Sequence, residues 1–515
     1  MKITVKKVET TVKIDGTSFP VLNYRLILQK NGLPNLSMGI SMGSNMTAKG
    51  AGKAVDMTVI KEGAKVEFLS KVGGQNIIFN GVVKSSQLNV KLSNVSTSSG
   101  NYNVTAEHSL ARIGGLPILD RLFVGAGRQK GSGLDAYRER LLDSKDEATA
   151  AIMRIMAGSF LKDGYENLLS TSSTSTIPGL VIKVLKALYA SEADTVAESA
   201  HDNRLKDKEA IAELDKLEKN IVGGVPNKDV TTRSDRSEFV EALVGKLAAN
   251  WANSNGLELL IQAMSSIFYC VAPKQNGDIM LRQDCPVYSK EDYTIDNKYI
   301  LGIGHNDMYN AVPITGIRIR VPLADNNEGA PASRMEYIQF PNKGESGIYQ
   351  YMSTHKFDMW FRFSSIYDQQ KSPKNKDAAT ESTYTKNSTG DTEEVTDQKE
   401  EDAKPDGEAD AERKLWIDIG KAAYATQKWR NSSIVLSIAH VPTIEVGDII
   451  KIDLSKADAL ADNIPRGTYF GNVDTIAFSG APGKVTMQVN ITNVRNKEEN
   501  DKYGFKEYPI YEKPN

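Results

Sequence analysis

Two stretches near opposite ends of the chain repeat one pattern, in which short strands surround a glycine-marked corner and a hairpin with a polar tip follows. The first stretch comprises residues 63–92 and 101–110, and the second comprises residues 432–454 and 466–494. In each final strand apolar and polar residues alternate strictly, which is typical of an antiparallel sheet with one buried face. The apolar positions are Tyr102, Val104 and Ala106 in the first stretch, and Val485, Met487, Val489 and Ile491 in the second. The repeat predicts a pair of related β-barrels, which suit rings and tubes because closure leaves no exposed edge.

Between these stretches the hydrophobic period changes from that of strands to that of helices. Residues 205–221 place Ile211, Leu214, Leu217 and Ile221 on one helical seam before Gly223 and Gly224, and residues 257–269 continue a helical pattern after Gly256. Such stripes indicate a packed core and not a cofactor site. Strand patterns return in residues 276–365, with DIMLRQ after a turn and a cleanly alternating segment at 314–321.

Residues 368–413 form the sharpest compositional break in the chain. They contain 14 Asp or Glu against 7 Lys or Arg, and no Leu, Ile, Phe, Trp or Met. Such a segment buries too little apolar area to offset about 1–2 kcal/mol of backbone entropy per residue, so the sequence predicts a disordered insertion.

The predicted fold class is therefore α+β and β-dominated, with two related antiparallel, tube-like β-barrel domains flanking a helix-rich middle domain and a long disordered acidic insertion. The expected boundaries are 1–123 for the first barrel, 124–275 for the helix-rich domain, 276–365 for a strand-rich domain, 366–414 for the insertion, 415–497 for a helix with the second barrel, and 498–515 for a C-terminal tail.

Composition excludes several functional classes. The net charge of −2 gives no argument for binding nucleic acid or membranes. No apolar run reaches 18 residues, so no membrane-spanning helix is expected, and the N-terminus lacks the apolar core of a signal peptide. Two cysteines exclude a disulfide scaffold and a structural zinc site. Cys270 and Cys285 either bridge a strand hairpin or, as we favour, are two reduced, buried thiols.

Catalytic, cofactor and metal sites are all expected to be absent. None of the five histidines has a second ligand at a metal-binding spacing, and no nucleotide or hydrolase motif occurs. The glycine-rich segment 125–133 has the spacing of neither nucleotide fingerprint, and we interpret it as a linker. His108 and His440 lie near predicted strand ends and are expected to be ordinary half-exposed histidines.

Particular segments resemble a known family. EGAKVEFLSKVGGQNIIFNGVV at 62–83 and NYNVTAEHSLARIGGLPILDRLF at 101–123 resemble the N-terminal domain of tail hub proteins. These proteins include phage baseplate hubs, the late control protein D family and the hub half of type VI secretion spike proteins. A helix at 413–430 followed by PTIEVGDIIKI at 442–452 and GTYFGNV at 467–473 resembles the second hub barrel. We expect four residues to mark structural turns: Gly81, Pro442, Gly447 and Asp448.

The resemblance implies a structural hub and no enzyme. In such hubs three copies place six barrels in a ring that joins a sixfold tail tube to a trimeric central spike. The expected partners are two further copies, the tail tube protein or distal tail ring, the central spike protein and surrounding baseplate proteins, with DNA only as transient cargo through the lumen. The expected location is the tail tip or baseplate of a virion, and the host cytoplasm during assembly. Two alternatives stay open: a tail-associated cell-wall-degrading enzyme mounted on hub barrels, and a bacterial surface protein built from β-domains.

Overall fold

The computed structural model of the chain describes residues 8–41, 57–91, 99–114, 201–222, 255–284, 291–307, 314–323, 334–340, 348–353, 432–440, 443–454 and 466–503, with short helical pieces between 178 and 186 and between 419 and 429. The whole predicted insertion, residues 366–414, and the segment 187–200 thus lie outside the described residues, as do Cys285 and Pro442.

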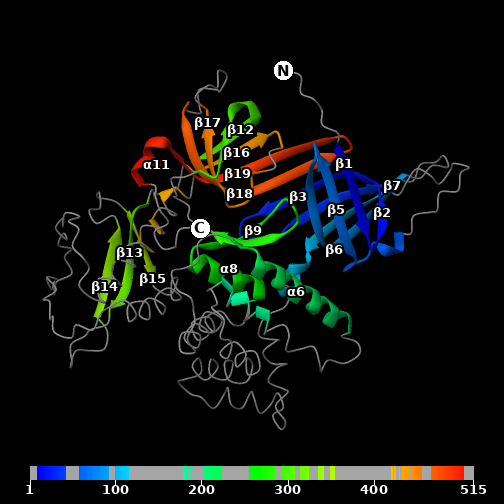
Figure 1. Cartoon of the computed structure of the whole chain (residues 1–515), viewed down its shortest axis with the longest axis horizontal. Coiled ribbons are helices and arrows are strands. Elements are labelled where there is room, and N and C mark those ends of the chain that lie inside the picture. Colours follow the sequence, from blue (N-terminus) through cyan, green and yellow to red (C-terminus); the bar gives the residue numbers. More distant parts are fainter. Residues whose placement is uncertain are drawn as a thin grey trace, which may run out of the picture.

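One mainly antiparallel sheet of 13 strands dominates the described part of the chain (Figure 1). Its N-terminal strands, which we call the first unit, are β1 (Val8–Ile14), β2 (Thr17–Phe19), β3 (Val21–Gln29), β4 (Asn35–Ser41), β5 (Lys65–Val72), β6 (Gln75–Lys91) and β7 (Ser99–His108). Its C-terminal strands, which we call the second unit, are β11 (Tyr293–Asp296), β12 (Ile300–Asp307), β16 (Ser432–Ile438), β17 (Ile449–Asp453), β18 (Thr468–Ala481) and β19 (Lys484–Asn496).

The alternation predicted for the two hairpin strands is confirmed. Val104 and Ala106 of β7 are buried, as are Met487, Val489 and Ile491 of β19. Tight turns follow the glycines of the sequence, because Gly73 and Gly74 both have positive φ between β5 and β6, at 58° and 90°. The alternation of apolar and polar residues therefore correctly predicts which face of each strand is buried.

The described strands do not form the predicted pair of separate, closed barrels. Hydrogen bonding runs along one open path, β12-β16-β19-β18-β3-β4-β7-β6-β5-β1-β2, and β18 of the second unit pairs directly with β3 of the first. The sheet is nevertheless strongly curled. The ring centroids of Tyr24 on β3 and Phe68 on β5 lie 4.7 Å apart, although three strands separate β3 from β5 in the path. Alternation predicts which face of a strand is buried, but it does not predict which strand lies beside it.

A single hydrophobic core extends through both units. Buried residues of the first unit, such as Leu26 and Phe79, belong to the same cluster as Ile476 and Phe478 of the second. Cys270 from the connecting region is also part of this cluster. The two units therefore share their apolar interior.

The connecting region contributes a small second sheet and two helices. Helix α8 (Gly256–Ser266) begins where the Asn255 side chain accepts a hydrogen bond from the Glu258 N–H at 2.9 Å, so Gly256 is its first residue. The second helix of this region is α6 (His201–Lys219), and a further described helix, α11 (Lys497–Tyr503), follows β19. Strands β8 (Ile221–Val222), β10 (Ile279–Gln283) and β9 (Tyr269–Pro273) form a sheet in the order β8-β10-β9. Figure 1 shows α6 and α8 beneath β9.

Two boundaries of the predicted helices are wrong. Ile221 lies in β8, since α6 ends at Lys219 and the main chain then pairs with Leu281 of β10. Tyr269 likewise opens β9. Both residues follow apolar helical stripes, and a buried strand is equally apolar, so periodicity alone does not separate the two states. A further three-stranded sheet contains β14 (Arg334–Phe340), β13 (Ile314–Leu323) and β15 (Ile348–Ser353), which includes the predicted strand at 314–321.

Candidate functional site

The strand order of the first unit recurs in the second. The first follows the path β2-β1-β5-β6-β7-β4-β3, and Pro20 alone links the two ends, β2 and β3. The second follows β11-β17-β18-β19-β16-β12, and the short helix η5 (Asn297–Tyr299) links its ends, β11 and β12. β1 is the one extra strand; β2 still runs parallel to β5, as β11 does to β17. One β unit therefore occurs twice in the chain.

The corner before β5 in the first unit and the corner before its counterpart β17 in the second unit are built by the same three main-chain hydrogen bonds. In the first unit Gly63 N–H donates to Val83 at 2.8 Å, Val83 N–H donates to Ala64 at 2.9 Å, and Ala64 N–H donates to the carbonyl of Lys61 at 3.1 Å. Gly63 has a φ of 80°, which L residues with a side chain rarely adopt.

In the second unit the equivalent bonds are Gly447 to Val473 at 2.8 Å, Val473 to Asp448 at 2.9 Å, and Asp448 to Glu445 at 3.2 Å. Gly447 has a φ of 88° and is thus the counterpart of Gly63. The corner is a repeated element of the fold, and the glycine is needed for its backbone conformation.

Gly81 does not lie in a turn, as the sequence predicted, but within β6 opposite His108. A Cβ atom there would approach the carbonyl oxygen of Glu107 to 2.1 Å, so close contact between backbones explains the glycine. Gly471 occupies the matching place in β18, where a Cβ atom would lie 2.5 Å from Ile491. Two residues further on, both strands carry a bulge against their hairpin partner, between Val83 and Ser85 and between Val473 and Thr475.

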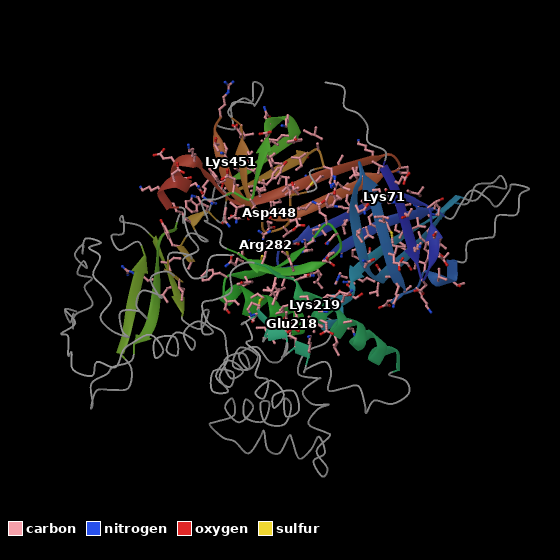
Figure 2. The ribbon with its side chains drawn as sticks, viewed as in Figure 1. Lys71, Glu218, Lys219, Arg282, Asp448 and Lys451 are labelled. Atoms are coloured by element: carbon pink, nitrogen blue, oxygen red, sulfur yellow. The ribbon has the colours of Figure 1, made fainter. Side chains whose placement is uncertain are left out.

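Asp448 holds the second corner to the connecting region. One carboxylate oxygen, Oδ2, accepts a hydrogen bond from the Glu445 N–H at 2.7 Å, and the other, Oδ1, lies 2.6 Å from Nη1 of Arg282 on β10 (Figure 2). Burial lowers the pKa of Arg282, but the carboxylates of Asp448 and Asp292 outweigh burial, so the pKa lies above its ordinary value. The guanidinium therefore stays charged, and it also donates to the carbonyl of Val446 at 3.3 Å.

The hairpin of β9 and β10, which we call the junction hairpin, contacts both units. Toward the first unit, Val271 exchanges two hydrogen bonds with Asn31, at 2.8 and 3.1 Å, and the carbonyl of Gln275 accepts from Ile78 N–H at 2.8 Å. Toward the second unit, the Gln275 side chain donates to the carbonyl of Ile444 at 2.6 Å. The junction hairpin therefore fixes the two units relative to each other.

The two units meet edge to edge along β18 and β3, a ladder that we call the internal joint. Six residue pairs form it, from Thr475 opposite Gln29 to Gly480 opposite Tyr24. Phe478 lies opposite Leu26, and both side chains are fully buried. Burial of each stabilises the joint by about 1.5–3 kcal/mol. A Cβ atom on Gly480 would lie 2.1 Å from the Tyr24 ring, so this glycine admits the aromatic side chain.

An open groove of about 490 Å³ lies at the internal joint and is lined by residues of β3, β4, β7, β18 and β19. Its walls offer hydroxyl and amide groups and two cations, Arg25 and Lys484, and no carboxylate lines it. The lining residues are Asn23, Tyr24, Arg25, Ser37, Met38, Gly39, Asn103, Val104, Thr105, Ser479, Gly480, Ala481, Lys484 and Thr486. The groove therefore offers hydrogen bonds and positive charge.

The histidines and the cysteine considered in the sequence have structural surroundings. His108 is buried, and not half-exposed as expected, because the short helix η2 (Ser109–Gly114) that follows it packs against α6 and its Nε2 lies 3.7 Å from the Glu213 carboxylate of α6. Its Nδ1 accepts a hydrogen bond from Leu110 N–H at 3.1 Å, and burial lowers its pKa. His440 is partly buried, with Nε2 3.0 Å from the Gln275 side-chain oxygen. Cys270 is buried and free.

Within the described residues, no three His, Cys, Asp or Glu side chains gather as a metal site would require. Among the same residues, no helix is both long and apolar enough to cross a bilayer.

The sequence pattern identified Gly447 and Asp448 but missed their partner, Arg282. One signal was available, namely a charged residue directly after the apolar run Ile279–Leu281 of the predicted strand, because a charge in a buried strand requires a partner. The internal joint had no such signal, since nothing in the sequence relates Phe478 to Leu26.

Comparison with known proteins gives structural matches only. No family model and no curated protein sequence matches the chain. A 43 kDa tail protein of prophage MuSo2 from Shewanella oneidensis aligns with 94% of this chain and 98% of its own, at 7% identity and a TM-score of 0.41. A tail protein from Neisseria meningitidis MC58 aligns with 94% and 96%, at 8% identity and a TM-score of 0.39. The E. coli c3393 protein, a type VI secretion component similar to the T4 tail proteins gp27 and gp5, aligns with 97% and 80%, at 10% identity and a TM-score of 0.32.

Proposed function

We propose that this chain is a structural hub of a phage tail or of a related contractile injection machine. In this role it joins the sixfold tail tube to a trimeric central spike. The observation that carries the proposal is the duplicated β unit, because a chain with two equivalent units converts threefold symmetry into sixfold symmetry. Three copies would present six units to a tube while keeping a threefold face for the spike.

The internal joint supports the same role. A ring that surrounds a tube needs units joined edge to edge, with curled sheets whose buried faces share a core. β18 and β3 are joined in this way, and Gly63 and Gly447 give the equivalent corners of the two units a similar backbone conformation. In the ring each unit would supply one of the six β domains of the hub.

The proposed role is mechanical and involves no catalysis. The described residues bring together structural ion pairs and hydrogen bonds, such as those of Arg282 with Asp448, that hold one segment to another. The expected partners are two further copies, the tube protein or distal tail ring, the spike and the surrounding baseplate proteins. The site of action would be the tail tip or baseplate of the particle, after assembly in the host cytoplasm.

Electron microscopy and light scattering of the purified protein test this function. We expect a ring of three protomers with a central hole, formed alone or on addition of the spike protein. Stable rings usually bury well over about 1,200 Å² at each interface, so the ring should persist on dilution to micromolar concentration. A protein that stays strictly monomeric, both alone and with its spike, would contradict the proposal.

A further inference from the structure

Three large hydrophobic side chains are conspicuously exposed among the described residues: Leu22 at 41%, Leu88 at 46% and Leu301 at 64%. The duplication relates them to one another and to the internal joint. Leu22 and Leu301 are equivalent, since each lies at a bulge in the strand that ends its unit, between Val21 and Asn23 in β3 and between Ile300 and Gly302 in β12. Leu88 has a different counterpart.

The bulges in the hairpins set the equivalence of β6 and β18. Val83 and Ser85 of β6 match Val473 and Thr475 of β18, so three residues further on Leu88 matches Phe478. Phe478 is completely buried, because β18 lies beside β3 in the internal joint. Leu88 is exposed, because nothing described in this chain occupies the same position beside β6.

The pairing edges show the same difference. The β18 edge opposite β19 is used twice: Thr468–Asn472 pair with β17, and Thr475–Gly480 pair with β3. The equivalent edge of β6 is used once, by Gln75–Val82 with β5. Beyond Val82, the described ladders of β6 involve only β7.

The complementary edge lies in the second unit. β3 has neighbours on both sides, β4 and β18, whereas its equivalent β12 pairs only with β16 among the described strands. Within the described residues, the outer edge of β6 beyond Val82 and the outer edge of β12 therefore pair with no strand, and the internal joint is formed by the counterparts of these two edges. Unpaired edges of this kind readily accept a further strand.

We propose that the β6 edge of one copy pairs with the β12 edge of a second copy, in the antiparallel register of the internal joint. Transfer of that register places Ser86 opposite Asp307, Leu88 opposite His305, Asn89 opposite Gly304 and Val90 opposite Ile303. This inference rests on the proposed function and specifies the contact by which its copies would join.

A second copy is the favoured occupant because the internal joint pairs β18 with β3, and the β6 edge of one copy and the β12 edge of another are the counterparts of these two strands. The contact is heterologous, because each copy uses its β6 edge toward one neighbour and its β12 edge toward the other. Such contacts form a closed ring when the rotation that relates neighbouring copies returns to the first copy. In a closed ring every β6 and every β18 would have a neighbour, so internal and intermolecular joints would alternate. Leu88 would then be buried as Phe478 already is.

Cysteine crosslinking tests the register directly. Directly opposite residues of an antiparallel pair have Cα atoms about 4.5–5.5 Å apart, within the range that a disulfide spans. We would mix the single variants Asn89→Cys and Gly304→Cys, each in a Cys285→Ser background, and expect a covalent dimer under mild oxidation. A Cβ atom at Gly304 meets nothing nearer than 3.8 Å, so this substitution leaves the strand intact.

Two controls accompany this experiment. The intramolecular pair Arg25→Cys with Ser479→Cys lies at the equivalent positions of the internal joint and should form a disulfide within one chain. Asn89→Cys mixed with Gly302→Cys is two residues out of register and should give at least fivefold less dimer.

A second variant tests the apolar contact. Leu88→Lys should raise the protein concentration needed for half-assembly at least tenfold, because the exposed leucine becomes buried only in the assembled ring. Leu22→Lys replaces a similarly exposed leucine outside the proposed register and should assemble normally. Both variants should keep the thermal stability of the unassembled chain.

The two proposals fail differently. If the wild-type chain forms no ring with or without its spike, the proposed function is wrong. If rings form, but Asn89→Cys and Gly304→Cys give no dimer and Leu88→Lys assembles like wild type, the copies join elsewhere and this inference is overturned. Crosslinking of Asn89→Cys to a different tail protein, and not to a second copy, would overturn it as well.

Discussion

At the scale of single residues, the fold depends on a few positions where backbone freedom or a buried charge is required. Gly447 supplies a positive φ at a corner, and Asp448 beside it binds the guanidinium of Arg282. The Arg282 and Asp448 side chains are only 17% and 10% exposed, so each depends on the other for compensation of its charge. Lys298 and Asp296 form a similar pair at 2.8 Å, but with side chains 54% and 51% exposed.

The two ion pairs predict different costs of mutation. Asp448→Ala should destabilise the protein by about 3 kcal/mol or more, because it leaves Arg282 buried beside the more distant Asp292 and leaves Glu445 N–H without its acceptor. Asp296→Ala should cost less than about 1 kcal/mol, since solvent screens an exposed pair. Urea unfolding of both variants measures the difference, and equal losses would mean that Asp448 makes no special contribution.

At the scale of strands and helices, the sequence predicts faces better than neighbours. Val104 and Ala106, and likewise Met487 and Val489, alternate with polar residues, and this pattern correctly identified two hairpin strands because a side-chain period of two reports burial on one face. The alternation does not predict that Phe478 lies opposite Leu26, since this pairing joins strands that are far apart in the sequence. Asp448 was predicted as a turn residue from its local motif, whereas its partner Arg282 comes from a separate element.

The strand glycines give a prediction at this scale. Gly81→Val should destabilise the first unit by at least about 2 kcal/mol, because a side chain there would collide with the main chain of β7. Gly304→Val serves as the matched control, since it places the same β-branched side chain in a strand where a Cβ atom has room. Thermal unfolding of both variants checks the expectation. A Gly81→Val protein as stable as the control would show that β6 and β7 separate easily at that point.

At the scale of the whole molecule, one sheet and one core run through two units whose strands lie far apart in the sequence. The junction hairpin adds hydrogen bonds from Val271 and Gln275 to both sides, and Cys270 contributes to the shared core. Two independent barrels connected by a linker would each bury their own interior. Here the interior of one unit is completed by residues of the other, so the energetic unit is larger than either repeat.

The two units should therefore unfold together. Phe478→Ala removes a buried ring from the internal joint and should cost about 3–5 kcal/mol, because a cavity remains between β18 and β3. Since the core is continuous, this loss should move one common transition to lower temperature and should not separate the units into two transitions. Calorimetry measures the overall transition. Fluorescence of a dye attached at Arg25→Cys reports on unfolding of the first unit, and a dye at Ser437→Cys reports on unfolding of the second. Different midpoints for the two probes would mean that each unit is stable alone, and that the internal joint connects them without making them one cooperative structure.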